Sequence, residues 1–250
     1  MTFSFPGSED VELASNIRKV IEHRSSNSAR SLQKEIGVSE AGEKCARRLA
    51  YKIAGQKPTN PPSDPWASIQ GTAIHAWLAE AFERFNDKDA PRFLIERKVN
   101  VTDDLAGTAD LFDIIDGMVI DHKCVGATSM KNKKRDGIDE KMRIQVNLYG
   151  YAYEKLGYTV NKVALIFYPL GGRLDGMHTV IEDYNRQIAL KAIERLDGIK
   201  LLVLQLDPMN NAQNWALIPA VASYGCVYCP YYLPGSNDLS IGCPGEVNAQ

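Results

Sequence analysis

The chain has 250 residues, of which 44% are hydrophobic and 24% charged, and its formal net charge is −2. These values suit one large globular domain and exclude a nucleic-acid binder that is basic throughout, although a local basic groove remains open. The N-terminal stretch MTFSFPGSED has no signal-peptide pattern, and no apolar run approaches the ~20 residues of a membrane helix. The sequence therefore predicts a cytoplasmic protein without a membrane partner. In that reducing compartment its five cysteines are expected to be free, catalytic or metal-bound.

Apolar spacing predicts an alternation of helices and strands along the chain. Helices are expected over 10–23, 39–54 (with Ser39 as N-cap), 66–86, 138–156 and 182–206, and strands over 92–101, 107–115, 118–124 and 162–170. The basic stretch MKNKKRDG (130–137) is expected to be a loop, and residues 207–250 a Cys-rich tail. This order predicts an α/β or α+β protein with one central sheet.

The helix over 66–86 has a regular apolar stripe, made by Ile69, Ala73, Ile74, Trp77, Leu78, Ala81 and Phe85. His75 lies at the edge of this stripe. A histidine there is more often packed at the border of a core than bound to a metal. Glu96, on the following strand, is either a carboxylate that supports a site or a solvated residue at the sheet edge.

The stretch GTADLFDIIDGMVIDHKCVG (107–126) predicts a β-hairpin with Asp116-Gly117 as a two-residue turn. Counting from that turn sets Asp110 opposite Lys123, with Asp121 diagonal to Asp110 on the same face. Two carboxylates can hold Mg²⁺ or Mn²⁺, and the lysine would stand beside the ion. A salt bridge between Asp110 and Lys123 is the simpler alternative. Cys124 is expected to face away as a buried structural thiol.

Gln145 and Tyr149 are four residues apart and share one face of the predicted helix over 138–156. They either reach a phosphate or a base, or pack as an ordinary helix flank against the sheet. In the tail, the pair Cys226 and Cys229 has the spacing of metal ligands and is followed by proline. Cys243 and the distant Cys45 complete a set of four.

The motifs GTAIH, GTAD, IDHK and QVNLY, in this order, resemble those of the PD-(D/E)XK nucleases, and more narrowly their RecB-like branch. The resemblance covers about residues 39–243. It implies a restriction-endonuclease-like core, in which helices flank a central mixed sheet. It also implies a metal-dependent DNA exonuclease that uses Mg²⁺ or Mn²⁺ and acts on DNA ends independently of sequence, in recombination, repair or end processing. The small chain is similar to stand-alone phage or CRISPR-adaptation nucleases.

The resemblance also assigns roles to individual residues. The metal ligands would be His75, Asp110, Asp121 and the backbone carbonyl of His122. Lys123 would be the catalytic lysine, and Gln145 and Tyr149 would position the substrate.

The cysteines resemble those of iron–sulfur nucleases in the same branch. That similarity implies a [4Fe–4S] cluster held by Cys45, Cys226, Cys229 and Cys243. Thirteen residues separate Cys229 from Cys243, more than in the relatives. By sequence, four cysteines bind Zn²⁺ equally well.

Basic residues near both predicted sites are either solvated or in contact with DNA phosphates. They are Arg47, Arg48, Lys131, Lys133, Lys134, Arg135, Lys141 and Arg143. We expect one nuclease domain over 1–250, with an N-terminal helix and loop (1–38), a core (39–206) and a tail (207–250) that closes on Cys45. A non-catalytic DNA-binding module and a zinc-stapled interaction protein are the alternatives. The Asp–Asp–Lys set argues against the former, since a binder needs no charged metal face.

Overall fold

The computed structural model describes residues 8–27, 33, 35–60 and 64–245. Its helices are α1 (Ser8–Ser26), α2 (Val38–Ala41), α3 (Ala46–Ile53), α4 (Trp66–Phe85), α5 (Ala127–Asp136), α6 (Glu140–Lys155) and α7 (Arg186–Leu206), with short 3-10 helices η1 (Leu174–Gly176), η2 (Ala212–Leu217) and η3 (Tyr224–Tyr228). Its strands are β1 (Phe93–Thr102), β2 (Leu105–Asp113), β3 (Met118–Val125), β4 (Lys162–Pro169) and β5 (His178–Asp183). The predicted α/β class is confirmed. Within these residues no helix is long and apolar enough to cross a membrane.

The five strands form one mixed sheet in the order β1-β2-β3-β4-β5. Neighbouring strands are antiparallel except β3 and β4, which are parallel. A parallel pair needs a long crossover, and here α5 and α6 provide it. The crossover brings α6 back across the sheet and so sets its side chains against β3.

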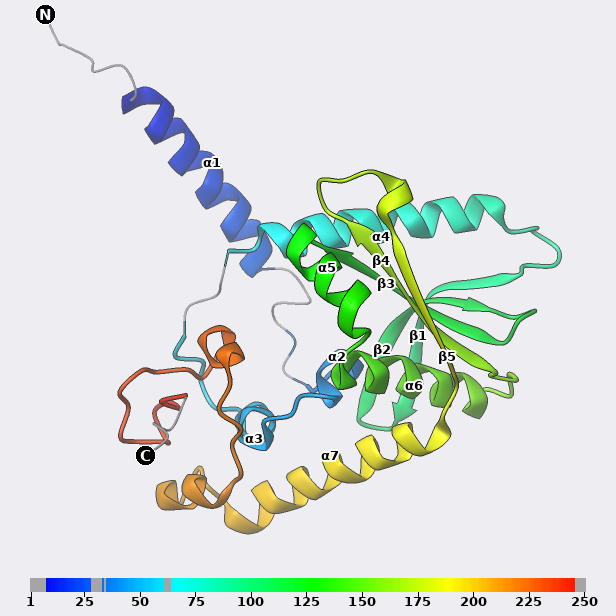
Figure 1. The fold of residues 1–250 in the computed structure, drawn as a ribbon. Helices are drawn as coiled ribbons and strands as arrows, with labels where there is room; N and C mark the ends of the chain where they lie inside the picture. Colours follow the sequence, from blue (N-terminus) through cyan, green and yellow to red (C-terminus); the bar gives the residue numbers. More distant parts are fainter. Residues whose placement is uncertain (1–7, 28–32, 34, 61–63, 246–250) are drawn as a thin grey trace, which may run out of the picture.

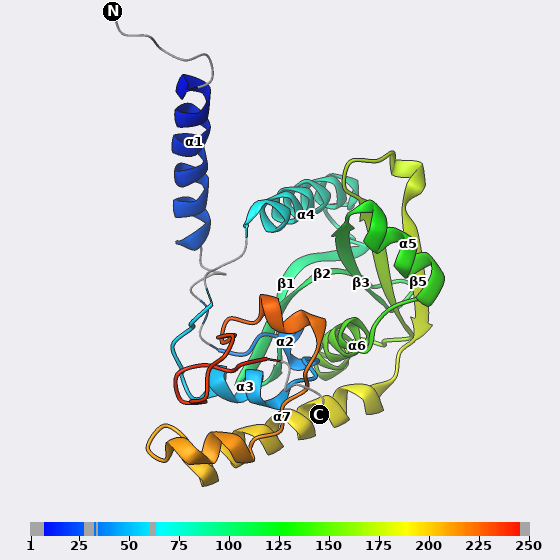
Figure 2. The same ribbon diagram turned by 60° about the vertical axis from the view of Figure 1, so that its left-hand side comes forward.

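Helices cover both faces of the sheet (Figures 1 and 2). One face carries α4, and the other carries α6 with α7 packed behind it. The larger core lies on the α6 side, where the ring of Phe112 stacks on that of Tyr153 with centroids 4.2 Å apart. By contrast α1, which corresponds to the helix predicted over 10–23, projects away from the body in both views. Helix α1 continues to Ser26, three residues into the loop predicted after residue 23, and residues 28–32 and 34 of that loop lie outside the described residues.

The predicted apolar stripe of α4 is partly wrong. Trp77 and Phe85 are 67% and 73% exposed, and no residue of α4 is fully buried. Phe82 packs instead, 5.0 Å from the ring of Phe93 and 6.0 Å from that of His122. The helix is turned so that the line through His75 and Phe82 meets the sheet. That rotation brings His75 to the sheet surface.

The single helix predicted over 39–54 is broken into α2 and α3. Its N-cap is Gly37, so the assignment of Ser39 was wrong. Helix α6 passes close to the break: a Cβ on Gly42 would lie 2.8 Å from the backbone of Lys141. Periodicity alone cannot show such an approach. The break leaves Cys45 at the N-cap position of α3.

Two further predictions are wrong because the local sequence signals for these elements are weak. The basic stretch is not a loop but most of helix α5, whose one buried residue is Met130 and which ends before Gly137, at φ +76°. Strand β5 was missed, and the last long helix starts at Arg186 rather than at 182. Every other residue of β5 is exposed, as is common at a sheet edge, so no apolar run marks the strand.

Candidate active site

The hairpin of β2 and β3 has a different register from the predicted one. Leu111 pairs with Ile120 and Asp113 with Met118, which leaves a four-residue connection, 114–117. Asp113 holds this turn: its Oδ1 accepts hydrogen bonds from the N–H groups of Ile115 and Asp116 (3.0 and 3.2 Å). The predicted pairing of Asp110 with Lys123 is therefore wrong.

The register error is two residues, and side chains alternate with a period of two. Asp110, Asp121 and Lys123 consequently stay on one face, as the sequence predicts. The side chain of Asp110 now lies across from Asp121 instead of Lys123. The Asp110–Lys123 salt bridge, the simpler interpretation of the motif, is replaced by an ion pair between Lys123 and Asp121.

Strands β2 and β3 separate at this point. Their pairing ends at Leu111 and Ile120, after which β2 continues with β1 and β3 with β4. In the fork, Asp110 Oδ2 accepts a hydrogen bond from the N–H of His122 (2.7 Å). The N–H and C=O of a strand residue point to the same side, so the carbonyl of His122 also faces the fork. Oxygen atoms of Asp110, Asp121 and the His122 backbone thus border the fork.

Asp121 is the most enclosed charged group of the fork, at 1% exposure. Its Oδ1 accepts a hydrogen bond from Gln145 Nε2 (2.8 Å), and its Oδ2 lies 2.6 Å from Lys123 Nζ. Lys123 Nζ also donates to Gln145 Oε1 (3.3 Å). Burial raises the pKa of Asp121 to about 6, although the Lys123 ammonium opposes this. The site therefore holds a carboxylate that lacks full compensation for its charge.

Gln145 and Tyr149 of α6 lie beneath the fork, 8% and 4% exposed. Gln145 contacts Asp121 and Lys123 rather than open surface. Gly107, in the GTAD motif, makes room for Tyr149: a Cβ there would lie 2.9 Å from the Tyr149 hydroxyl. Gln145 thus supports the carboxylate and lysine of the fork, and contact of either residue with a substrate stays a prediction.

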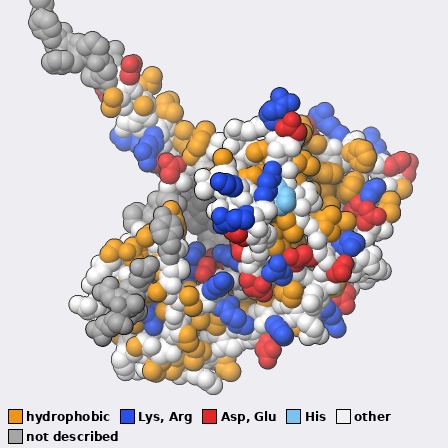
Figure 3. Space-filling model, viewed as in Figure 1, with side chains coloured by type: hydrophobic (Ala, Val, Ile, Leu, Met, Phe, Trp, Pro, Cys, Tyr) orange, Lys and Arg blue, Asp and Glu red, His pale blue; other side chains and the backbone are white. Residues whose placement is uncertain are grey.

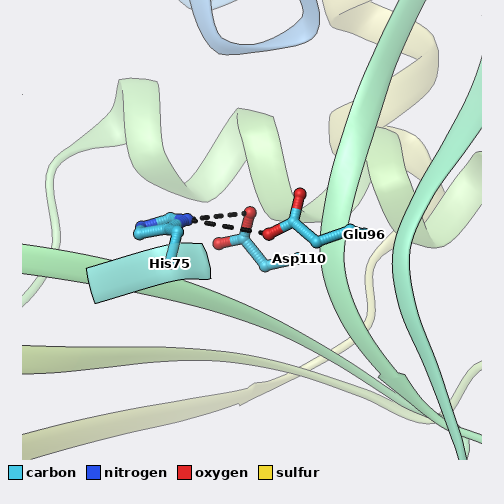
Figure 4. Close-up of side chains that lie close together, drawn as sticks. All are labelled: His75, Glu96 and Asp110. Atoms are coloured by element: carbon cyan, nitrogen blue, oxygen red, sulfur yellow. Dashed lines mark ion pairs between the residues drawn. The ribbon is translucent and has the colours of Figure 1, made fainter. Parts of the chain in front are cut away.

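A second group of side chains meets beside the fork (Figure 4). His75 Nδ1 from α4 lies 3.4 Å from Asp110 Oδ1 and 4.0 Å from Glu96 Oε1 of β1. One potential ligand atom from each of the three lies within 4.8 Å of the other two. The contact with Asp110 raises the pKa of His75, and burial together with the Asp110 charge raises that of Glu96.

Glu96 is the residue that sequence reasoning placed least well. Its φ is +44°, in the left-handed region that residues other than glycine rarely adopt. The β1–β2 ladder pairs Ile95 with Leu111 and Arg97 with Ala109, with no pair at Glu96 between them. This irregularity lies opposite Asp110. Strand alternation assumes regular backbone, so it could not have placed the carboxylate.

The four predicted cysteine ligands meet around one cavity. Cys45, Cys226, Cys229 and Cys243 line a volume of about 130 Å³, together with Tyr51 and Arg48. No three of these sulfur atoms lie within 4.8 Å of one another in the described chain. Cys124 does not line this cavity and is half-buried on β3, less enclosed than the buried thiol we expected.

Lys and Arg side chains gather over α5 (Figure 3), a helix that contains four of the eight predicted DNA-binding cations, Lys131, Lys133, Lys134 and Arg135. Seven of the eight have a partner within the chain: Arg47 with Ile218 O, Arg48 and Lys141 with Glu43, Lys133 with Asp139, Lys134 with Gly176 O, Arg135 with Asp136, and Arg143 with Glu182. Lys131 and Lys134 also line a shallow groove between α5 and residues 169–172. DNA contact by these residues stays a prediction, and the groove is its best location.

The sequence matches no protein-family model and no curated protein. Among solved structures, the alkaline exonuclease of Laribacter hongkongensis is 13% identical, with a TM-score of 0.50 over 74% of this chain and 94% of that one. The same protein in complex with dAMP gives a TM-score of 0.51 at 13% identity and the same coverage. A phage-related exonuclease from Haemophilus somnus is 10% identical over 69% of this chain and 96% of that one, with a TM-score of 0.46.

At these identities the likeness to the alkaline exonuclease establishes the fold alone. The chain has a restriction-endonuclease-like architecture, with a five-stranded mixed sheet flanked by helices. The predicted fold is confirmed. The candidate active site is argued from its own geometry.

Proposed function

We propose that this protein is a metal-dependent DNA exonuclease of the PD-(D/E)XK superfamily, RecB-like branch, that hydrolyses phosphodiester bonds. The observation that carries the proposal is the fork between β2 and β3, where Asp110, Asp121 and Lys123 share one face above Gln145. The exonuclease activity named for the structural neighbours agrees with it.

The residues of the fork fit a divalent cation. Asp121 is buried and its Oδ2 pairs with the Lys123 ammonium at 2.6 Å, yet burial still raises its pKa, so a divalent cation would stabilise the ionised carboxylate. Carboxylate and carbonyl oxygens are the donors that Mg²⁺ and Mn²⁺ prefer, and a histidine nitrogen favours Mn²⁺. Asp110, Asp121, His75 and the carbonyl of His122 would hold the ion. When bound, a divalent ion lowers the pKa of a water and offsets charge on the phosphate.

The chain's own residues do the positioning. Gln145 fixes Asp121 and Lys123 relative to each other through hydrogen bonds of 2.8 and 3.3 Å. Lys123 sets a positive charge at the edge of the fork, where it stabilises negative charge that grows on a phosphate during attack by water. A new bond between phosphorus and the water oxygen forms as the bond to the sugar oxygen breaks, the attacking water loses a proton to solvent, and the departing sugar oxygen takes one up from solvent. No side-chain nucleophile is needed.

The substrate we propose is the end of a DNA strand, bound without regard to sequence, in recombination, repair or end processing. Lys131 and Lys134, at the groove beside α5, would contact backbone phosphates. The proposal treats residues 1–250 as one nuclease domain whose tail closes on Cys45.

For the cysteine cavity we propose a [4Fe–4S] cluster rather than Zn²⁺. Four thiols are a donor set that fits either group. A tetrahedral zinc with bonds of about 2.3 Å would hold all four sulfurs within about 4 Å of one another. The wider separation of the thiols and the volume of about 130 Å³ favour the bulkier cluster. Iron, acid-labile sulfide and zinc, measured on the purified protein, distinguish the two.

The test of the proposed activity is cleavage of end-labelled single- and double-stranded DNA, with Mn²⁺ and with EDTA. We expect Mn²⁺-dependent release of short products by the parent and none by Asp121→Asn. Glu83→Gln, on the exposed side of α4, is the matched control and should cleave as the parent does. Cleavage by Asp121→Asn at the parent's rate, or no cleavage by any of the three, contradicts the proposal.

A further inference from the structure

Helix α1 has an apolar stripe that the rest of the described chain leaves largely uncovered. The helix projects from the body, and apolar side chains are visible along its surface (Figures 1 and 3). Four of them are well exposed: Val11 (70%), Leu13 (63%), Ile17 (54%) and Val20 (69%). Most of the stability of a helix in a folded protein comes from the packing of its apolar face. This face is therefore expected to pack against a partner.

The stripe follows a heptad spacing. Asp10, Ile17 and Arg24 are seven residues apart, so they lie nearly in line on one face of the helix. Ile17 is midway between the two charges, about 10 Å from each along the helix axis. Apolar residues flank this line, with Leu13 and Val20 on one side and Ala14 and Ile21 on the other. The face thus has an acid at one end, a base at the other and apolar side chains between them.

Two such faces are complementary in antiparallel orientation. When a two-fold axis passes through Ile17 of both copies, Asp10 of each copy meets Arg24 of the other, and an ion pair forms at each end of the stripe. In parallel orientation the same faces would set Asp10 against Asp10 and Arg24 against Arg24. The charges therefore favour an antiparallel pair and oppose a parallel one.

The flanks of the stripe also match in this orientation. Leu13 of one copy meets Val20 of the other, and the small Ala14 meets the larger Ile21. Ala14 and Ile21 also line an open groove of about 400 Å³ that Trp66, 54% exposed, borders at the start of α4. A second helix on the stripe would therefore cover apolar surface of the body as well as of α1.

We propose that α1 is a dimerisation helix that pairs, antiparallel and centred on Ile17, with α1 of a second copy of this chain. Asp10 and Arg24 are exposed, and neither forms an ion pair with another described residue, whereas Arg18 of the same helix pairs with Glu22 at 2.6 Å. The apolar side chains supply the binding free energy, and the terminal charges fix register and direction. The inference goes beyond the proposed function and does not depend on it.

Sedimentation equilibrium of the full chain tests the dimer. We expect the parent to associate reversibly to a dimer between about 1 and 100 µM. Ile17→Lys places two ammonium groups face to face on the axis and should weaken the dimer by about 100-fold or more. Ser15→Lys adds the same charge on the opposite, exposed side of α1 and is the matched control, which should dimerise as the parent does.

Exchange of the terminal charges tests the orientation. Asp10→Arg brings two guanidinium groups together at each end, Arg24→Asp brings two carboxylates together, and each should weaken the dimer about 10-fold. The double variant restores both ion pairs in reverse, so its affinity should return to within about threefold of the parent's. Glu12→Arg, on the other side of the helix, is the control for the acid-to-base change. Rescue by the double variant shows that the single variants did not simply lose the helix.

Three outcomes would overturn the inference. They are a parent that stays monomeric at the highest concentration, an Ile17→Lys variant that dimerises with the parent's affinity, and a double variant as weak as the single ones. A monomeric parent would leave the stripe to a different partner. Because all of these measurements report mass, DNA cleavage can be tested separately, and failure of either proposal leaves the other standing.

Discussion

The carboxylate fork and the cysteine cavity are both candidate metal sites, but they are built in opposite ways. The ligands of the fork stand on β2 and β3 and rest on buried side chains of α6, such as Gln145 and Tyr149. The cysteines stand at the start of α3, in or beside the short helix η3, and at an isolated bridge between Tyr232 and Cys243. In the first site the core holds the ligands. In the second the ligands must help to hold the chain.

The links between the tail and the rest of the chain show the same contrast. Arg47 donates two hydrogen bonds to the carbonyl of Ile218, and the N–H groups of Thr59 and Asn60 both reach the carbonyl of Pro230. The fork instead lies between two strands of the central sheet, and helices α4 and α6 pack against β3 on either side of it. Loss of a ligand should therefore unfold the tail in one case and stop chemistry in the other.

The largest effect is expected from Cys45→Ala. At a site without regular secondary structure around it, the free energy of metal binding contributes directly to folding. Loss of the metal should therefore lower the free energy of unfolding by several kcal/mol. Metal content and thermal unfolding check this. Cys124→Ala, outside the cavity, is the control and should keep the metal. If Cys45→Ala retains the parent's metal content and melting temperature, the cavity is no metal centre.

At the fork, Lys123→Ala should slow cleavage strongly and change stability little, the reverse of the effect of Cys45→Ala. Removal of a charge positioned at the phosphate should slow cleavage by about 10²–10³-fold. With Mn²⁺ present, the free energy of unfolding should change by less than about 1 kcal/mol, because the ion offsets the charge of Asp121. Single-turnover cleavage and thermal melts measure both. The control is Lys162→Ala, an exposed lysine of β4. A rate within threefold of the parent would remove Lys123 from the chemistry.

Asp113→Asn tests the turn that fixes the register of the fork. Burial would raise the pKa of Asp113, but hydrogen bonds from Arg92 and from the backbone of Asp116 hold it below the ordinary value. A lowered carboxyl pKa contributes stability above the unfolded value near 4, and this is lost as the pH falls through the folded value. The variant should thus be less stable than the parent by about 1–3 kcal/mol at pH 7.

The difference between Asp113→Asn and the parent should shrink from about pH 4 downward, where Asp113 of the unfolded parent takes up a proton, and level off once the folded carboxylate is protonated as well. Urea unfolding at several pH values measures it. A deficit that is the same at pH 3 and pH 7 would mean that the charge of Asp113 does not matter.

The smallest effect is expected from the double variant Lys131→Ala, Lys134→Ala. Loss of two phosphate contacts should weaken DNA binding about 10-fold and reduce the slope of log affinity against log salt by one to two. Fluorescence anisotropy at several salt concentrations measures this. Lys88→Ala combined with Lys191→Ala, two exposed lysines away from the groove, is the control. Equal slopes for the two double variants would mean that the groove beside α5 does not contact DNA.

The sequence predicts those features that depend on regular alternation. Asp110, Asp121 and Lys123 share a face because two successive strands keep their period, and an error of two residues in the register leaves that face unchanged. Features that depend on a break in regularity cannot be predicted from this alternation. The left-handed Glu96 interrupts its ladder, Gly42 breaks a helix where α6 passes, and the half-exposed β5 has no apolar run.

The meeting of Cys45 with Cys226, Cys229 and Cys243 also bears on the order in which the chain folds during synthesis. All five strands lie between residues 93 and 183, so the sheet and the fork can form while the tail is still inside the ribosome. The cysteine centre can close only after residue 243 has emerged. A nascent chain that stops before that point would contain the whole carboxylate site and yet leave Cys45 without partners. Closure of this centre thus requires residues 226–243, which are synthesised after the whole carboxylate site.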